Sequence, residues 1–432
     1  MALAVHTNAA VSQYTLPECV DRALKQNADV LVAKKRLEEA AGMIIEARAG
    51  YLPSLATAAN YEYLESDYAT LAGASPNNRP FIWNVYLRLT ENIYAGGATR
   101  GRLDIARLQK QSRLLDYQAT VDRIIQDVRI AFYDILRDRA DIVVHEQAIT
   151  FLQQQENNVR NQFELGTGQK LNIMRAGVNL AFEEAALVDS RNRLRNARLQ
   201  LSELLAIPVA TDVGDVPFDI NGELKRETAP PLLTDCLTRA ITQRPELTAR
   251  DNDVTVQRRQ LTVDRSELFP HIDLFTGYDV VSEQTIAPGL ADHYSGYVAG
   301  VQVSWHIFDG LVTKGRLNAT RARLSEAETT ATAMRRTVQA EVLRAYRDIQ
   351  RADEQLKTQT ANVKLAEESL KLAADNFKLG LSSQLELLQS RLDLTRAQTA
   401  ELSARFDYNA ALARLQRAMG SHFELRPTEP DR

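Results

Sequence analysis

The strongest constraint in this sequence is an internal repeat, because one unit of roughly 200 residues is written twice. In the first part of each unit, matched residues lie 217 positions apart, and these pairs are Cys19/Cys236, Pro53/Pro270 and Tyr61/Tyr278. Further along, the offset is 214, and the pairs include Gly96/Gly310, Gly101/Gly315, Phe163/Phe377, Leu165/Leu379, Gly166/Gly380 and Leu171/Leu385. We therefore predict two copies, 14–213 and 231–425, joined by an interrepeat segment at 214–230.

Each copy predicts the same order of elements: a helix, a β-hairpin, a very long helix and a shorter return helix. The first helix, 15–50, should end before Pro53, because the residue before a proline disfavours helix. The expected hairpin, long helix and return helix span 54–94, 98–163 and 170–207 in the first copy. In the second copy they span 271–308, 312–377 and 384–420. The fold class is thus mainly α with a small β part.

Each hairpin is predicted to consist of two long amphipathic strands. From Phe81 to Tyr94 the odd positions are mostly apolar and the even positions mostly polar. Strands of roughly 10–14 residues are long enough to cross a bilayer when tilted. The alternative is a half-buried strand pair of a soluble sheet, which shows the same alternation.

The long helices carry apolar residues at a seven-residue spacing, which is typical of coiled-coil packing. The series are Leu114, Val121, Val128, Ile135, Ile142 and Ile149, and then Val342, Ile349, Leu356, Val363, Leu370 and Phe377. About 65 residues of helix make a rod on the order of 100 Å. The first helix and the return helix together nearly match that length, so they should stack beside the rod. This predicts long antiparallel helical hairpins.

Four strands leave open edges and cannot close a barrel alone, and lipid tolerates no unpaired edge. Closure takes at least about eight strands, so several chains must contribute. Dimers and trimers both satisfy this arithmetic.

Composition excludes other classes of protein. The formal net charge of -4 does not indicate a basic surface that would bind nucleic acid, and no apolar run is long enough for a transmembrane helix.

Residues 1–12 lack a secretory signal, which suggests a mature or engineered start, and no lipid-anchor motif surrounds Cys19.

The sequence also predicts no catalytic, cofactor or metal site. The glycine-rich run 96–101 lacks the Gly-Lys-Ser/Thr ending of a phosphate loop. The six histidines never stand at metal-ligand spacing. We therefore expect neither an enzyme nor a cofactor.

The double repeat, the junctions at 94–97 and 308–310, and the two Phe-x-Leu-Gly turns resemble the outer-membrane efflux protein family, TolC-like. The resemblance covers 14–425. It implies a homotrimer with a shared transmembrane β-barrel in the outer-membrane lipid and a helical tunnel, or α-barrel, across the periplasm. It also implies a passive exit duct, for efflux or type I secretion, that docks to a periplasmic adaptor and an inner-membrane transporter. The alternative is a soluble periplasmic coiled-coil adaptor or scaffold.

The resemblance also suggests site residues. The adaptor-contact tip would comprise Leu165, Gly166, Thr167, Leu379, Gly380, Leu381 and Ser382. The periplasmic aperture would comprise Glu386 and Gln389, with Asn172 and Arg175 as their counterparts. The alternation predicts a barrel lumen lined by Asn84, Arg88, Gln302, Ser304 and His306. Basic residues just inside the periplasmic rim of the barrel are solvated or anchor it to headgroups, and they are Arg100, Arg102, Lys314 and Arg316.

Overall fold

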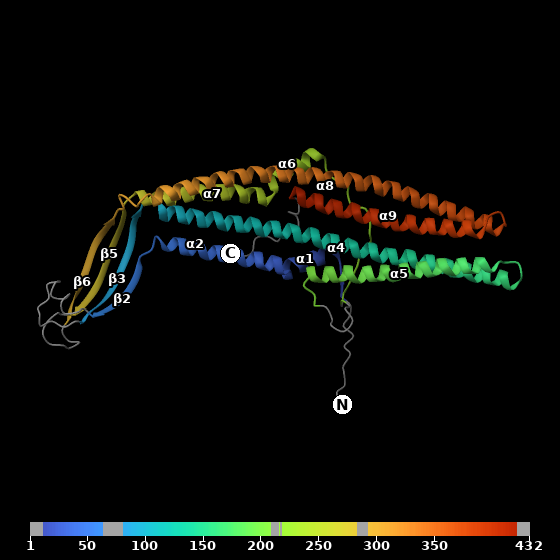
Figure 1. Ribbon diagram of the computed structural model, residues 1–432, viewed down its shortest axis with the longest axis horizontal. Coiled ribbons are helices and arrows are strands. Elements are labelled where there is room, and N and C mark those ends of the chain that lie inside the picture. Colours follow the sequence, from blue (N-terminus) through green and yellow to red (C-terminus); the bar gives the residue numbers. More distant parts are fainter. Residues whose placement is uncertain (1–11, 64–80, 209–215, 217, 283–292, 421–432) are drawn as a thin grey trace, which may run out of the picture. The chain divides into compact units, whose positions relative to one another are not determined.

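The computed structural model describes residues 12–63, 81–208, 216, 218–282 and 293–420. The chain, drawn as a ribbon in Figure 1, divides into two compact units by its internal contacts. The helical unit comprises 1–34, 116–247 and 334–432, and the sheet unit comprises 35–115 and 248–333. Each unit is described by itself.

The helical unit is built around four long helices. These are α4 (Ala98–Glu164), α5 (Lys170–Leu204), α8 (Val312–Lys378) and α9 (Gln384–Met419), of which α4 and α8 also extend into the sheet unit. Ser190 of α5 bonds to α4, and Arg391 of α9 lies over a ring of α4. Thr360 of α8 donates to Glu401 of α9 at 2.9 Å. The order across the layer is therefore α5, α4, α9, α8.

The two repeats bury equivalent side chains in two cores. Ile135 and Ile349, one in each copy, are completely buried and lie in separate hydrophobic clusters. Cys19 and Cys236 also occupy equivalent buried positions, and both are free thiols. Burial raises the pKa of Cys19 to about 12, so its thiol is a neutral, small core side chain.

The predicted single helix at 15–50 is wrong in one respect, because the structure has two helices, α1 (Leu16–Gln26) and α2 (Ala28–Ala49). Asn27 between them adopts extended backbone. Its side chain donates to the Leu204 carbonyl at 3.1 Å and accepts from the Asp29 N–H at 2.9 Å. These bonds replace helical ones and tie the break to the end of α5.

The second copy has a break at the equivalent place, between α6 (Leu233–Gln243) and α7 (Pro245–Arg265). Arg244 is extended, and the proline that follows it disfavours a helical conformation for the residue before it. A 3₁₀ turn, Ser266–Leu268, follows α7.

The interrepeat segment holds both copies together. Strand β4 (Phe218–Ile220) pairs in parallel with β1 (Ser12–Tyr14). Residues 221–231, the interrepeat strap, then contact three long helices. Glu227 accepts from Arg129 of α4, Arg226 pairs with Asp353 of α8 at 2.6 Å, and Asn409 of α9 donates to the Lys225 carbonyl.

The sheet unit contains a four-stranded antiparallel sheet in the order β2-β3-β5-β6. Its strands are β2 (Ser54–Tyr63), β3 (Phe81–Ala95), β5 (His271–Ser282) and β6 (His293–Ser304). The two β-hairpins meet where β3 pairs with β5, so β2 and β6 lie at the edges. Neither edge strand has a further partner within the described residues.

The pairing register sorts the side chains of the sheet onto two faces. One face, the apolar face, contains Leu55, Thr57, Ala59, Tyr61, Trp83, Val85, Leu87, Leu89, Leu274, Thr276, Tyr278, Val280, Tyr297, Ala299, Val301 and Val303, together with the polar residues Glu91 and Ser295. The opposite face, the polar face, includes Asn84, Arg88, Asp273, Asp279 and Gln302. Much of the apolar face is exposed in the single chain, as at Leu55 (66%) and Val301 (63%). A sheet of this kind needs an apolar environment on one side.

Strand β6 ends at Ser304, short of the expected boundary at 308. Ser304 pairs with His271, the first residue of β5, and the residue before it is Pro270. Proline has no N–H to continue the ladder. His306, expected among the lumen residues, therefore lies beyond the strand. Among the described helices, none is long and apolar enough to span a membrane.

Candidate functional site

The turn between α4 and α5 is a tight helical stop that exposes a leucine. Gly166 has φ +77°, its N–H donates to the Phe163 carbonyl at 2.9 Å, and the Thr167 N–H donates to the Gln162 carbonyl. This bonding pattern ends a helix at a residue in the left-handed conformation, which glycine adopts without strain. Leu165 is thereby left 78% exposed.

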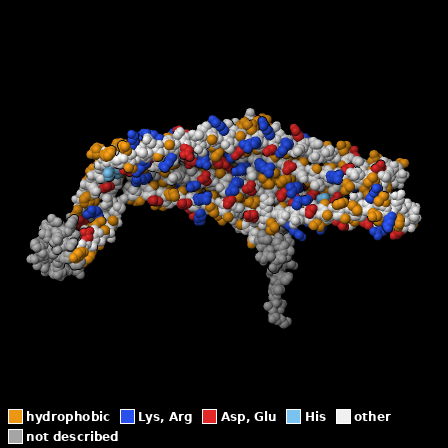
Figure 2. Space-filling model, in the orientation of Figure 1, with side chains coloured by type: hydrophobic (Ala, Val, Ile, Leu, Met, Phe, Trp, Pro, Cys, Tyr) orange, Lys and Arg blue, Asp and Glu red, His pale blue; other side chains and the backbone are white. Residues whose placement is uncertain are grey.

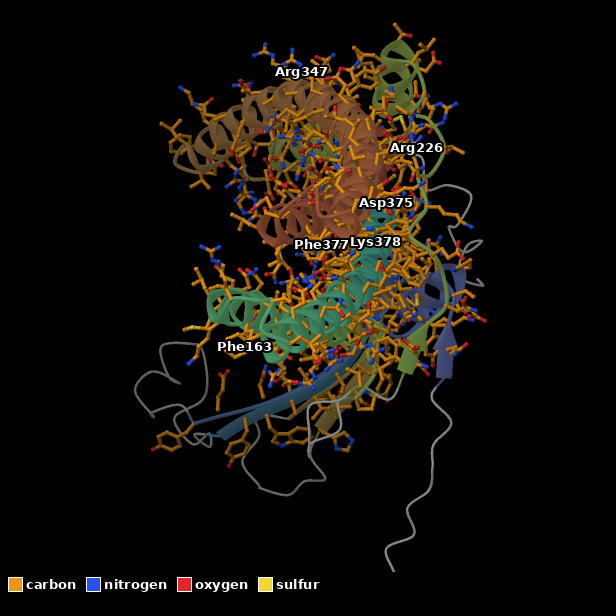
Figure 3. The ribbon with its side chains drawn as sticks, turned by 90° about the vertical axis from the view of Figure 1, so that its right-hand side faces the viewer. Phe163, Arg226, Arg347, Asp375, Phe377 and Lys378 are labelled. Carbon is orange, nitrogen blue, oxygen red and sulfur yellow. The ribbon has the colours of Figure 1, made fainter. Side chains whose placement is uncertain are left out.

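The turn between α8 and α9 repeats this geometry. Gly380 has φ +74°, and the Leu381 N–H donates to the Asn376 carbonyl at 2.8 Å. Leu379 and Leu381 are 73% and 76% exposed, while Ser382 donates to the Ala373 carbonyl. Figure 3, seen from the turns, shows Phe163 and Phe377 at the ends of the two hairpins. All the residues expected at the tip thus lie in two similar turns with leucines facing solvent.

The expected aperture residues lie on exposed or half-exposed parts of the return helices. The Glu386 carboxylate accepts from the Ser383 N–H at 3.1 Å, and Ser383 in turn accepts from the Glu386 N–H, which forms a capping box. Gln389 is exposed and donates to Asp393 at 3.0 Å. In the first copy, Arg175 is exposed and Asn172 is half-buried.

Asp393 was missed by the sequence analysis, although its position could have revealed it. Glu386, Gln389 and Asp393 are spaced three and four residues apart and therefore share one face of α9. The face carries two acids, one on either side of the glutamine. A further charged residue, Arg391, points away from this face into the packing between α9 and α4.

Arg391 is buried, with 7% of its surface exposed, and two of its guanidinium nitrogens have no hydrogen-bond partner. Its guanidinium lies 5.5 Å from the centroid of the Phe151 ring of α4. Burial lowers the pKa of Arg391, and Glu183 of α5 partly offsets this effect. The equivalent position in the first copy is Gly177, so the duplicated packing does not require this arginine. The position of Arg391 in the helical repeat of α9 does not predict that its side chain is buried.

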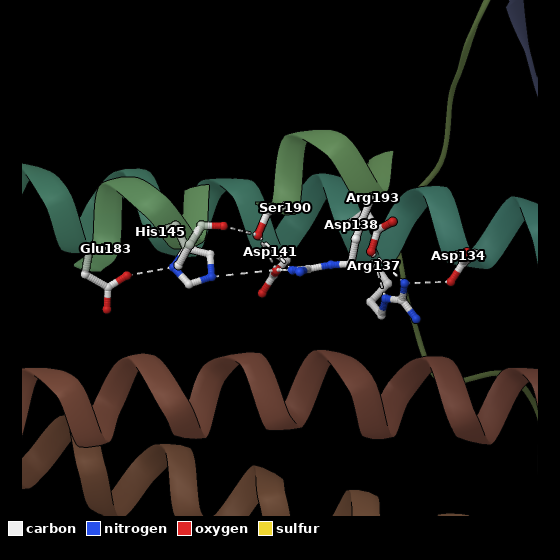
Figure 4. A network of polar contacts seen from close by, with 9 residues as sticks. Asp134, Arg137, Asp138, Asp141, His145, Glu183, Ser190 and Arg193 are labelled. Carbon is white, nitrogen blue, oxygen red and sulfur yellow. Dashed lines mark hydrogen bonds and ion pairs between the residues drawn. The ribbon is translucent and has the colours of Figure 1, made fainter. Parts of the chain in front are cut away.

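A chain of polar contacts joins α4 to α5 (Figure 4). His145 Nδ1 lies 2.7 Å from Glu183, and its other ring nitrogen faces Asp141. Asp141 accepts from Ser190 at 2.8 Å and from Arg193 at 2.6 Å. Arg193 is exposed, but the other four residues are buried where an apolar coiled-coil seam was expected, and so they specify how the two helices align.

Two neighbouring carboxyl groups in α4 have perturbed pKa values. Burial raises the pKa of Asp138, and Arg137, which donates to it at 2.7 Å, opposes the shift. Burial likewise raises the pKa of Asp134, again against Arg137. Desolvation therefore outweighs the attraction of the shared arginine at both sites.

The polar face of the sheet carries an ion pair with aromatic neighbours. Arg88 lies 3.4 Å from Asp279, and its guanidinium lies 5.0 Å from the Tyr86 ring and 5.2 Å from the Phe275 ring. Asn84, Gln302 and Ser304 belong to the same face by register.

The basic residues expected near the rim of the barrel differ in whether they form an ion pair. Arg316 pairs with Glu267 at 3.6 Å, and Arg100 and Arg102 are exposed. Across the described residues, no group of histidine, cysteine, aspartate and glutamate side chains could hold a metal ion.

Known proteins share this organisation. CusC of Escherichia coli K12, a cation efflux system protein, is 24% identical over 168 residues, which are 38% of this chain and only 35% of that protein. Protein CyaE of Bordetella pertussis is 27% identical over 77% of this chain and 69% of its own length. The fold matches the Campylobacter jejuni CmeC outer membrane channel with a TM-score of 0.79 and 16% identity, over 98% of this chain and 90% of that one.

A family model described as outer membrane efflux protein matches twice, over residues 19–206 and 236–421. The two matches correspond to the two copies of the repeat, and together they cover most of the chain. The chain therefore belongs to the outer membrane efflux protein family.

Proposed function

We propose that this chain is the outer-membrane exit duct of a tripartite efflux or type I secretion system, working as a homotrimer. The observation that carries the proposal is the sheet, which has one apolar and one polar face and two edges without partners among the described residues. Edges of this kind are satisfied in lipid only by closure into a barrel, and one chain supplies too few strands. In the barrel the apolar face contacts lipid and the polar face lines the lumen.

The outer helices of the helical layer support a ring of copies. In α8, Leu365 and Leu372 are exposed at a spacing of seven residues. On the opposite edge, α5 exposes Met174, Val178 and Phe182. An α8 edge that packs on the α5 edge of the next copy is a head-to-tail contact, and such contacts close into rings. Figure 2 shows acidic and basic side chains intermixed over the helices.

The number of copies and the partners rest on family membership. Three chains would give a twelve-stranded barrel and a helical tunnel through the periplasm. The two turns at 163–171 and 377–385 would form the tip that contacts a periplasmic adaptor, which connects the duct to an inner-membrane transporter. The duct itself performs no chemistry, and its partners supply the energy.

We expect the chain, expressed with a secretory signal, to fractionate with the outer membrane and to require detergent for extraction. Light scattering of the extracted protein should give the mass of three 48.4 kDa chains. The trimer should conduct ions across planar lipid bilayers, because its lumen is polar. A monomer that is soluble without detergent would instead favour a periplasmic scaffold and would refute the duct.

We further propose that Glu386 and Asp393, from each of three copies, form acidic rings at the periplasmic aperture. Rings of carboxylates favour cations. Glu386→Gln should therefore reduce the cation preference of the pore, measured as the reversal potential in a salt gradient. Glu18→Gln is a matched control, because Glu18 forms the same capping box with Thr15 at the start of α1. Equal reversal potentials for wild type and Glu386→Gln would remove Glu386 from the aperture.

A further inference from the structure

A cavity of about 280 Å³ lies in the helical unit between α8 and α9. Four arginines and two carboxylates line it, and they are Arg244, Arg344, Arg414, Arg417, Glu341 and Asp348. Its remaining walls are formed by alanines and by Gln126 of α4. The lining thus has two more positive than negative charges.

The acidic groups at the cavity are already engaged. Arg244, which is 6% exposed, pairs with Glu341 and lies 3.0 Å from Glu246 behind it. Asp348 pairs with Arg351 at 3.2 Å, outside the cavity. Glu341 thus pairs with a buried arginine and Asp348 with an exposed arginine of its own helix, so both carboxylates of the lining already have a partner.

The other arginines lack such acceptors. Arg344 of α8 and Arg414 of α9 have no hydrogen-bond or ion-pair partner among the residues that the structure describes, although both line the cavity. Arg417 contributes to the field that lowers the pKa of Glu246, after the larger effect of Arg244. Two guanidinium groups from two helices therefore face one cavity with their donors available.

The internal repeat shows that packing does not require these arginines. Buried residues around the cavity have identical counterparts in the first copy: Val342, Ala411 and Leu415 correspond to Val128, Ala197 and Leu201. The arginines have none. At the positions of Arg344, Arg414 and Arg417 the first copy has Ile130, Gln200 and Glu203. The basic cavity is therefore a property that only the second copy has.

We propose that this cavity binds a small oxyanion ligand that carries at least two phosphate or carboxylate groups. The planar guanidinium group donates two parallel hydrogen bonds to such oxygens, so Arg344 and Arg414 can each hold one group. Arg417 adds positive charge, and the alanines leave room between the helices. A bound ligand would link α8 to α9 next to the break between α6 and α7. This site is independent of transport through the duct.

Isothermal titration calorimetry of the detergent-extracted full-length protein tests the site, with inorganic pyrophosphate and tricarballylate as separate probes. We expect saturable binding of at least one probe, with one site per chain, that weakens at high ionic strength. Pyrophosphate alone would assign the phosphate class, and tricarballylate alone would assign the carboxylate class. Arg344→Gln and Arg414→Gln should each weaken binding by about tenfold, because each removes charge-assisted hydrogen bonds.

Arg347→Gln is the matched control. Arg347, labelled in Figure 3, is an exposed residue of α8 that does not line the cavity, and its replacement removes the same charge. It should leave the dissociation constant within about twofold. Because Arg344 and Arg414 are exposed, their variants should keep the wild-type melting temperature without ligand. Two results would overturn the proposal: no saturable binding of either probe, or equal weakening by all three variants.

Discussion

Replacing Leu165 and Leu381 together by aspartate should abolish efflux while the duct still assembles. Both leucines stand at the turns of the helical hairpins, 78% and 76% exposed, and the backbone bonds of each turn do not involve their side chains. A docking site formed by exposed apolar side chains loses most of its affinity when a charge must be desolvated there. Under the proposed function, resistance to a compound that the system exports, measured with the proposed adaptor and transporter, should fall by roughly tenfold or more.

Lys364→Asp provides the control for this experiment. Lys364 is exposed on α8, about four turns before the turn at Gly380, and its replacement changes the net charge by as much as the two Leu→Asp replacements together. It should leave resistance unchanged. Bilayer conductance of the leucine double variant should also equal that of wild type. Full resistance in the double variant would show that the adaptor does not contact these turns.

Gly96→Ala should strongly destabilise the sheet unit, whereas Gly310→Ala at the equivalent position should not. Both glycines have positive φ values, +57° and +68°, so alanine at either position costs about 1 kcal/mol of backbone strain. At Gly96 a Cβ atom would also lie 2.7 Å from the Ser266 carbonyl oxygen and 2.9 Å from its Cα. Relief of that clash needs movement of backbone and costs about 1–3 kcal/mol more.

Gly310 has open space instead, with nothing within 4 Å of a Cβ atom. Scanning calorimetry of the extracted protein should therefore give a midpoint on the order of 5 °C lower for Gly96→Ala than for Gly310→Ala. The amount of protein in the membrane fraction should fall in the same order. Equal midpoints would mean that the contact between Gly96 and Ser266 does not limit stability.

Much of the fold could be predicted because its elements are long and regular. In α4, an apolar residue recurs every seven positions from Leu114 to Ile149, and this period outweighs local ambiguity. Alternation in β3 gave the two faces of the sheet correctly, and the register between strands places Asn84 and Gln302 on one of them. The duplicated turns at Gly166 and Gly380 could be located because each requires a left-handed residue.

Other features depend on contacts between residues far apart in the chain. The helix break at Asn27 is fixed by a hydrogen bond to the Leu204 carbonyl, 177 residues away in the chain, and no local sequence pattern predicts it. The interrepeat strap looked like a short polar linker, but Arg226 and Glu227 bind three different helices. From the sequence alone such residues are interpreted as solvated charges, because their partners lie far away in the chain.

The sequence alone determined the class of this protein: a duplicated chain with four amphipathic strands and long helical hairpins. Periodicity determines these properties, because it reports which side of each element must be buried. Only the tertiary structure decided which charges are buried, paired or free. Arg391 and Arg414 both look like exposed helical arginines in the sequence, yet Arg391 is buried against Phe151, whereas Arg414 is exposed and lines a basic cavity. The reason is that the environment of a charge is set by neighbours from other helices, which local periodicity does not encode.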